Sequence, residues 1–298
     1  MKPPSDGHLE EALRDYNEEA NRLESEGGPD RELMDVYLNR GAVLSMMDSY
    51  VSALADFDDA IEIMTHIEAA GGEVDAGAFV RAFVSRGELL SKDIRCMADD
   101  YAFAASRLHL LDADSRYYDR KRIVLMCIGC AEDLVDVGLP TEIDPFIEKA
   151  WSLLIAKEDP WSQNRYLDLL NLKGQAERVL GVDEAEETFS EAVAVGTALL
   201  EEGCLEDMMS LVFPFANRGD LRHEDGRMDA YIADRKSAIV LLEEMLGANR
   251  LDDVRLLAHM HQDLANTYLL LDRVKEAEDH LLREVALGIG NARDSLRQ

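Results

Sequence analysis

The chain has 298 residues and a net charge of −30, because 61 Asp and Glu side chains stand against only 31 Lys and Arg. This acidic excess argues against nucleic acid as a direct ligand, since phosphates are contacted mainly by Lys and Arg. With 47% hydrophobic residues, 7 Pro and 19 Gly, the chain is too apolar for disorder and too poor in turn residues for an all-β sandwich. The composition favours long helices.

The first 30 residues are predicted to hold a flexible start and one capping helix. Apolar residues recur along one face of residues 7–25, at Leu9, Leu13, Tyr16, Ala20 and Leu23. The longest uninterrupted apolar stretch of the chain, residues 123–131, is far shorter than the roughly 20 residues that span a bilayer, and no secretory signal is recognised. We therefore expect a cytoplasmic protein that does not contact a membrane.

Further along the chain, apolar residues recur at helical spacing between short turn signals at residues 27–30, 71–72, 138–140, 159–160 and 247. Pro214 falls inside one of these apolar segments, among Leu211, Val212, Phe213 and Phe215. Because proline disrupts a helix interior, either a helix begins near residue 210 or a longer helix is kinked there.

Self-similarity divides the chain into repeats. The pattern aromatic, any residue, Asn or Ser, Arg, Gly occurs at residues 37–41, 83–87 and 215–219, and sixteen residues after each Gly come Phe57, Phe103 and Arg235. The same frame, anchored at Ala131, Lys173 and Ala265, leads to Ile147, Phe189 and Leu281. The second positions therefore recur at residues 57, 103, 147, 189, 235 and 281, in steps of 46, 44, 42, 46 and 46.

These residues resemble the tetratricopeptide repeat family, whose first helix carries a bulky residue, Leu, Gly or Ala and an aromatic, and whose second helix carries Ala, Phe and Ala. The best matches are residues 37–63 and 264–287, and residues 182–194 repeat the second-helix pattern. The period here is roughly ten residues longer than the usual 34 residues, which implies longer helices or loops.

The resemblance implies an all-α fold: a right-handed α-solenoid of about six antiparallel helix pairs behind the N-terminal capping helix. The predicted repeats span residues 31–70, 75–111, 117–157, 161–202, 205–246 and 251–288, and residues 289–298 form a C-terminal tail. Small residues should let paired helices approach closely. We expect Gly41 to face Phe57 and Ala60. We likewise expect Ala265 to face Ala277 and Leu281.

Residues with reactive side chains are interpreted mainly as packing. Cys127 and Cys130 have the two-residue spacing of a redox or zinc motif, but no second cysteine pair accompanies them, and the repeat frame places both at packing positions. We expect reduced, buried thiols. His259 and Asp263 are predicted to share a helix face through a polar contact. No phosphate-binding loop, nucleophile elbow or His-Glu-x-x-His motif is present, so we predict no catalytic residue, metal or cofactor.

Arg40, Arg86 and Arg218 occupy the same position in three repeats. Two interpretations stay open: a ladder of charge contacts with Asp or Glu of the paired helix, or receptors for an acidic ligand.

In the tetratricopeptide repeat family the first helix of each pair lines the concave surface, so the resemblance implies a set of partner-binding residues of mixed character. These residues are Asp35, Leu38, Ala42, Ser45 and Met46 in the first repeat; Arg81, Val84, Glu88, Ser91 and Lys92 in the second; Phe213, Ala216, Asp220, His223 and Glu224 in the fifth; and His259, Gln262, Asn266, Leu269 and Leu270 in the sixth. The carboxylate clamp of some relatives is not supported, because Leu38 and Ala42 stand where it needs polar side chains. Asn266 alone occupies a family-like asparagine position.

The predicted function is a non-catalytic scaffold or adaptor that holds a peptide or a partner helix along the concave groove. The net charge favours basic or neutral protein partners. One alternative is a peptide-sensing regulatory protein, and another is an all-helical enzyme that uses carboxylates of the groove.

Overall fold

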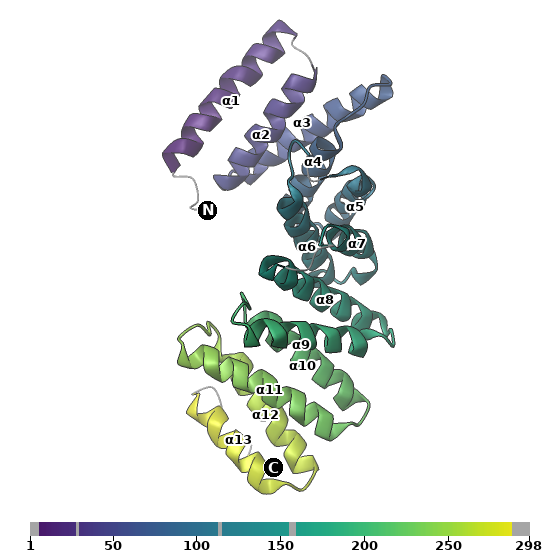
Figure 1. The fold of residues 1–298 in the computed structure, drawn as a ribbon. Coiled ribbons are helices and arrows are strands. Elements are labelled where there is room, and N and C mark those ends of the chain that lie inside the picture. Colours follow the sequence, from purple (N-terminus) through teal and green to yellow (C-terminus); the bar gives the residue numbers. More distant parts are fainter. Residues whose placement is uncertain (1–5, 28–29, 113–114, 155–158, 288–298) are drawn as a thin grey trace. The chain divides into compact units, whose positions relative to one another are not determined.

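The computed structural model describes residues 6–27, 30–112, 115–154 and 159–287 (Figure 1). Within these ranges it contains thirteen α-helices, two short 3-10 helices and no strand. The chain divides into two compact units, Met1–Ile155 and Ala156–Gln298, which we call unit 1 and unit 2. The predicted all-α fold of paired helices is thereby confirmed. The first five residues and the predicted tail at 289–298 lie outside the described residues.

Unit 1 consists of one leading helix and three helix pairs. Helix α1 packs on α2, and the pairs are α2 with α3, α4 with α5 and α6 with α7. The bounds are α1 Asp6–Glu26, α2 Asp30–Met46, α3 Tyr50–Ala69, α4 Ala76–Leu89, α5 Ile94–Ala105, α6 Arg120–Asp136 and α7 Asp144–Leu153. The 3-10 helices η1 (Leu108–Leu110) and η2 (Pro140–Glu142) lie in the connections before α6 and α7.

Unit 2 consists of three further pairs, α8 with α9, α10 with α11 and α12 with α13. The bounds are α8 Pro160–Leu180, α9 Ala185–Glu201, α10 Met209–Glu224, α11 Met228–Gly247, α12 Val254–Leu270 and α13 Val274–Ala286. Neighbouring pairs also pack together, through α9 on α10 and α11 on α12. Each range predicted as a repeat overlaps one helix pair.

Aspartates start several of these helices. Five of them precede a helix and accept a hydrogen bond from a backbone N–H of its first turn: Asp75, Asp93, Asp119, Asp159 and Asp253. The first N–H groups of a helix have no partner within the helix, so a carboxylate at this position stabilises its start. Part of the acidic composition is therefore explained by helix capping.

A glycine facing an aromatic ring marks the closest approach within several pairs. A Cβ atom at Gly41 would lie 2.9 Å from Cε1 of Phe57, which confirms the predicted contact. In the second pair the ring next to Gly87 belongs to Tyr101, whereas Phe103 is 54% exposed. The frame of sixteen residues is wrong there, because the connection between α4 and α5 brings the partner two residues earlier.

The fourth pair shows the same contact with its anchor moved by one residue. A Cβ atom at Gly174, and not at the predicted Lys173, would lie 2.7 Å from Cε1 of the buried Phe189. In the sixth pair Ala265, Ala277 and Leu281 belong to one core cluster of unit 2, in agreement with the prediction.

Pro214 lies inside α10, which begins at Met209, so the first of the two alternatives for this segment is correct. Proline has no N–H, and it leaves the carbonyl four residues earlier, that of Ser210, without its helical donor. The side-chain amide of Asn171 on α8 donates to that oxygen at 2.8 Å. A residue of the preceding pair thus satisfies the carbonyl that the proline leaves free.

Cys127 and Cys130 are free thiols buried within unit 1, as the packing interpretation predicts. Burial raises the pKa of Cys127 to about 12 and the pKa of Cys130 well above its usual value. Neither side chain is a ready thiolate at neutral pH. Among the described helices, none combines the length and the apolar character that a bilayer span requires.

Candidate interaction surface

One anionic and one cationic residue of the predicted groove, Asp35 on α2 and Arg81 on α4, contact other residues of the chain. Asp35 on α2 accepts a hydrogen bond from the hydroxyl of Tyr117 and pairs with Arg116 at 2.9 Å. Arg81 on α4 donates to Asn39 Oδ1 at 2.9 Å. The charges predicted to line a groove here therefore already have partners.

Other residues projected in unit 1 do not converge with Asp35 and Arg81. Leu38 and Val84 are buried, so they offer no surface to a partner, and the projection is wrong for both. Ser45 is half-buried, while Met46, Glu88 and Lys92 are exposed. Met46 ends α2 eleven residues after Asp35, which places it about 16 Å further along the helix.

In unit 2 the projected residues do come together. A cavity of about 260 Å³ opens between α10, α11 and α12. Its lining residues are Asp220, His223, Tyr231, Arg235, Asp263, Asn266, Thr267 and Leu270. Four of these eight, Asp220, His223, Asn266 and Leu270, belong to the set that the resemblance implied. We call this the unit 2 cavity.

The remaining projected residues of unit 2 lie near the cavity but do not line it. Phe213 precedes Asp220 by seven residues on α10, and His259 precedes Asn266 by seven on α12, so each lies two turns, about 10 Å, from the cavity on the same helix face. Phe213, His259 and Leu269 are exposed, and Gln262 is half-buried. The surface of α10 and α12 therefore continues past the cavity with apolar and polar side chains.

Arg235 is the buried charge at the base of the cavity. It stands where the repeat frame places an aromatic in other pairs, and only 10% of its side chain is exposed. Its guanidinium binds Asp220, lies 3.6 Å from Asp263 and contacts the ring of Tyr231 at 5.4 Å. In the sequence, the feature that could have indicated a functional role for Arg235 is an arginine at a position where other repeats have an aromatic residue. Matching the repeat pattern alone predicts only a packing residue there.

A second arginine, Arg178, also binds the carboxylate of Asp220. Arg178 on α8 donates to Asp220 Oδ2 at 3.1 Å and to Asn217 Oδ1 at 3.1 Å. Asp220 thus bridges two guanidinium groups, and Asp263 adds one more carboxylate. Arg235 thus offsets one of the two carboxylates that line the unit 2 cavity, and Arg178, which also binds Glu224, contacts Asp220 from outside the lining.

Two polar side chains at the rim keep hydrogen-bonding capacity. In the part of the chain that the structure describes, the carboxamide of Asn266 forms no hydrogen bond, and His223 makes only a ring contact with Tyr231, at 4.9 Å. A carboxamide supplies both donors and acceptors. Such a side chain matches the alternating N–H and C=O groups of an extended peptide.

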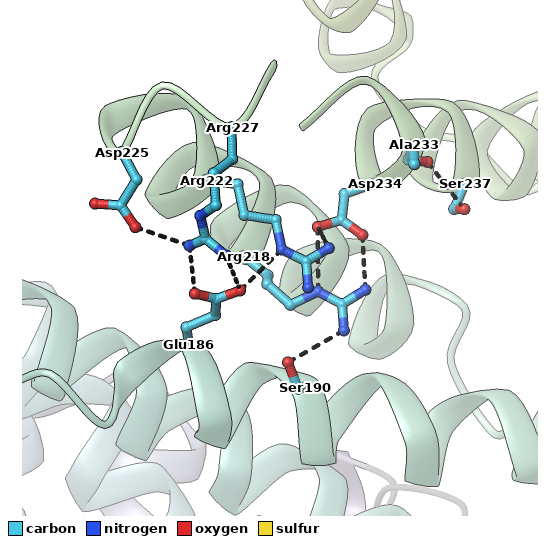
Figure 2. Close-up of polar contacts among 9 residues, drawn as sticks. All are labelled: Glu186, Ser190, Arg218, Arg222, Asp225, Arg227, Ala233, Asp234 and Ser237. Carbon is cyan, nitrogen blue, oxygen red and sulfur yellow. Dashed lines mark hydrogen bonds and ion pairs between the residues drawn. The ribbon is translucent and has the colours of Figure 1, made fainter. Parts of the chain in front are cut away.

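The recurrent arginines belong to the charge ladder, the first of the two interpretations. Arg40 and Arg86 each bind both oxygens of an Asp on the paired helix, at 2.6 to 2.9 Å. In unit 2, Figure 2 shows Arg218 and Arg222 meeting at the buried Asp234. Because these carboxylates already occupy the guanidinium groups, the arginines hold the helices of each pair together.

Figure 2 also shows how the ladder of unit 2 reaches α9. Glu186 accepts hydrogen bonds from Arg227 and, at 2.9 Å, from Arg222. These bonds, with Arg227 contributing most, lower the pKa of Glu186 to about 2. Arg218 also donates to Ser190 at 3.3 Å. Among the residues described, no group of three or more His, Cys, Asp or Glu side chains is arranged to hold a metal ion.

The fold, an array of paired helices, is similar to that of tetratricopeptide repeat proteins. Three solved structures are similar to it. The C-terminal part of a TPR repeat-containing protein from Cytophaga hutchinsonii has a TM-score of 0.57 at 15% identity, over 98% of this chain and 99% of that one. BtubC from P. vanneervenii has a TM-score of 0.56 at 17% identity, over 80% and 90%.

Aspartyl phosphate phosphatase F from Bacillus subtilis has a TM-score of 0.56 at 14% identity, over 96% of this chain and 76% of that one. No protein-family model and no curated protein sequence matches the chain. The likeness therefore concerns the fold alone.

Proposed function

We propose that the chain is a non-catalytic interaction scaffold that binds an extended peptide segment along α10 and α12, across the unit 2 cavity. The observation that carries the proposal is the convergence of Asp220, His223 and Asn266 on one cavity of about 260 Å³. A cavity of this size accepts one or two side chains, and the free carboxamide beside it can bond the peptide backbone.

The charge distribution narrows the class of partner. The cavity wall holds one guanidinium, that of Arg235, against the carboxylates of Asp220 and Asp263, whereas the whole chain carries −30. Long-range attraction therefore favours a basic or neutral partner, while the contacts at the cavity do not select one charge sign. Exposed apolar side chains two turns away, such as Phe213, extend the surface for apolar groups of the partner.

The test first captures the partner from a native lysate and then measures its affinity by calorimetry. Asn266→Ala combined with His223→Ala removes rim contacts from two exposed side chains, and we expect a loss of affinity of about tenfold with an unchanged helical spectrum. Glu187→Ala on α9 is the matched control, because Glu187 is exposed and lies outside the cavity. It should alter mainly the association rate and its dependence on salt.

The opposite pattern would refute the assignment. If the double variant retains its affinity and Glu187→Ala lowers the equilibrium affinity strongly, the partner binds the second helices instead of the surface of α10 and α12.

A further inference from the structure

A short segment of unit 1 lies across the first helices of the first two pairs. It comprises residues 115–118, Ser-Arg-Tyr-Tyr, and precedes α6 of the third pair. The hydroxyl of Tyr117 donates to Asp35 Oδ1, across 82 positions of the sequence, and Arg116 pairs with Asp35 Oδ2 at 2.9 Å. One carboxylate on α2 thus accepts from a phenol and a guanidinium of a distant segment.

Helix α4 supplies the other part of this contact. The guanidinium of Arg81 lies 5.2 Å from the ring centroid of Tyr117, and that of Arg116 lies 5.3 Å from it. Arg81 is itself fixed by hydrogen bonds to Asn39 and to the carbonyl of Leu38. Cation–π contacts of this kind favour an aromatic ring over an aliphatic side chain.

Close backbone approach shows that the segment is seated on α4. A Cβ atom at Gly77 would lie 2.7 Å from Ser115 Oγ and 3.2 Å from Tyr117 Cδ2, so a larger residue would displace the segment. Burial and the bond to Asp35 raise the pKa of Tyr117, which keeps the phenol a donor at neutral pH. We call the surface formed by Asp35, Gly77 and Arg81 the Asp35 surface.

The described residues on either side of the segment are held more firmly than the segment itself. Leu111 is buried, its carbonyl accepts from Lys149 at 2.5 Å, and Asp119 caps α6. Within the segment, 67% of the Arg116 side chain is exposed, and the contacts of Arg116 and Tyr117 with the Asp35 surface are a hydrogen bond, an ion pair and ring contacts. Residues 116 and 117 can therefore leave the surface without unfolding a helix.

We propose that the Asp35 surface is a second recognition site, for a peptide segment in which a basic residue precedes a tyrosine, and that Arg116 and Tyr117 are its internal occupant. The occupant defines the chemistry: a hydroxyl and a cation for one carboxylate, and a ring for the Arg81 guanidinium. A partner segment with this pair replaces each contact that it displaces. The site lies in unit 1 and is independent of the unit 2 cavity.

The experiment uses the full chain and an acetylated, amidated peptide Ser-Arg-Tyr-Tyr-Asp, the sequence of residues 115–119. Arg116→Ala combined with Tyr117→Ala empties the surface, and calorimetry should show at least tenfold tighter peptide binding than to the unaltered chain. Adding Asp35→Asn should abolish that gain. A peptide with Phe in place of the first Tyr should bind at least fivefold more weakly, because it has no hydroxyl. His66→Gln, placed in the emptied chain as control, should change nothing, because His66 is exposed on α3 and belongs to neither surface.

Equal binding to the emptied and unaltered chains, or binding that ignores Asp35→Asn, would overturn the proposal. If the Arg116→Ala, Tyr117→Ala chain does not fold, hydrogen exchange of the unaltered chain with and without peptide tests the proposal instead. Excess peptide should then increase exchange at the amides of residues 115–118, and unchanged exchange would refute the displacement. Loss of partner affinity in the Asn266 and His223 variants reports on the unit 2 cavity alone, so the two proposals can fail separately.

Discussion

In unit 1 the surface at the N-terminal halves of α2 and α4 is covered by the chain itself, whereas the equivalent surface of α10 and α12 in unit 2 is open. Asp35, Arg81, Phe213 and His259 hold the same position, six residues before the anchor of their repeats. The first two contact residues 116 and 117, and the last two are exposed. The same helix-pair architecture therefore presents two different surfaces, and the connection before α6 makes the difference.

The largest expected effect is on the free energy of unfolding, and it tests whether both units are stabilised by a buried aromatic ring that packs on a glycine of the paired helix. Phe57→Ala in unit 1 and Phe189→Ala in unit 2 should each lower the free energy of unfolding by about 3 to 5 kcal/mol, because both rings are buried against a glycine of the paired helix. Denaturant unfolding measures the loss. Hydrogen exchange should show that each variant loosens mainly its own unit, since contacts in repeat arrays are local.

Phe103→Ala is the matched control for both variants. This ring is 54% exposed, so the substitution should cost less than about 1 kcal/mol. A loss as large as that of Phe57→Ala would restore the frame of sixteen residues and contradict the assignment of Tyr101 as the core residue.

The second effect is a difference in acid sensitivity. His261 and His280 of unit 2 are buried with their Nδ1 atoms 2.9 Å apart, and burial, followed by the neighbouring His280, lowers the pKa of His261 to about 4. The unfolded chain takes up a proton near pH 6.5 and the folded chain does not, so stability falls as the pH drops below 6.5. Between pH 7 and 5 unit 2 should lose about 2 kcal/mol.

Hydrogen exchange of the two units at pH 7 and 5, corrected for intrinsic rates, measures this loss. His261→Gln should reduce the pH dependence in unit 2, and adding His280→Gln should remove the share of both histidines, because burial lowers the pKa of His280 too. His66→Gln in unit 1 is the control, because His66 is exposed. Equal acid sensitivity of both units in the unaltered chain would show that the histidine pair does not govern it.

A third and smaller effect concerns the entry to α10, the helix that carries part of the open surface. Asn171→Ala should cost about 1 to 2 kcal/mol, because it leaves the Ser210 carbonyl without its donor. In a Pro214→Ala background residue 214 regains an N–H, and the same substitution should then cost about 1 kcal/mol less. Thermal unfolding of the four chains gives this coupling, and strict additivity would argue against the role of Asn171.

The smallest effect is expected at the ladder of Figure 2. Glu186→Gln should lower stability by about 0.5 kcal/mol at neutral pH, as is usual for partly exposed ion pairs. Because the pKa of Glu186 is lowered from 4.5 to about 2, its contribution is present above pH 4.5 and is lost as the pH falls towards 2. The difference in melting temperature between the parent and the variant should therefore shrink from pH 5 to pH 3.

Much of the helix pairing follows from residues that are close in the sequence. The contact between Gly41 and Phe57 can be predicted because one short connection separates their helices. A small residue opposite a large one indicates that the two helices approach closely. A constant spacing predicts Phe103 instead of Tyr101, because it assumes connections of equal length. Chain spacing carries no information on the length of each turn, so the contact between α4 and α5 needed the structure.

The candidate surfaces were predictable only in part. Asp220, His223 and Asn266 were found by projecting the repeat onto helices, but projection treats each first helix as if it stood alone. Leu38 was placed on the surface for this reason, although it is buried. The contact between Asp35 and Tyr117 joins residues 82 positions apart through an irregular connection, and no periodic pattern encodes it.

The polar contacts of α8 with the connection before α10 and with the start of α10 have a mechanical consequence. Asn164 donates to the Cys204 carbonyl at 3.0 Å and accepts from the Glu206 N–H at 2.9 Å, and Asn171 holds Ser210. Apolar contacts between helices tolerate sliding because they have no preferred direction, whereas hydrogen bonds weaken steeply when they are misaligned. A shift of residues 204–210 by one residue along α8 would break all three bonds at once. This junction should therefore be the stiff point of unit 2, and elastic bending of the unit should concentrate elsewhere along it.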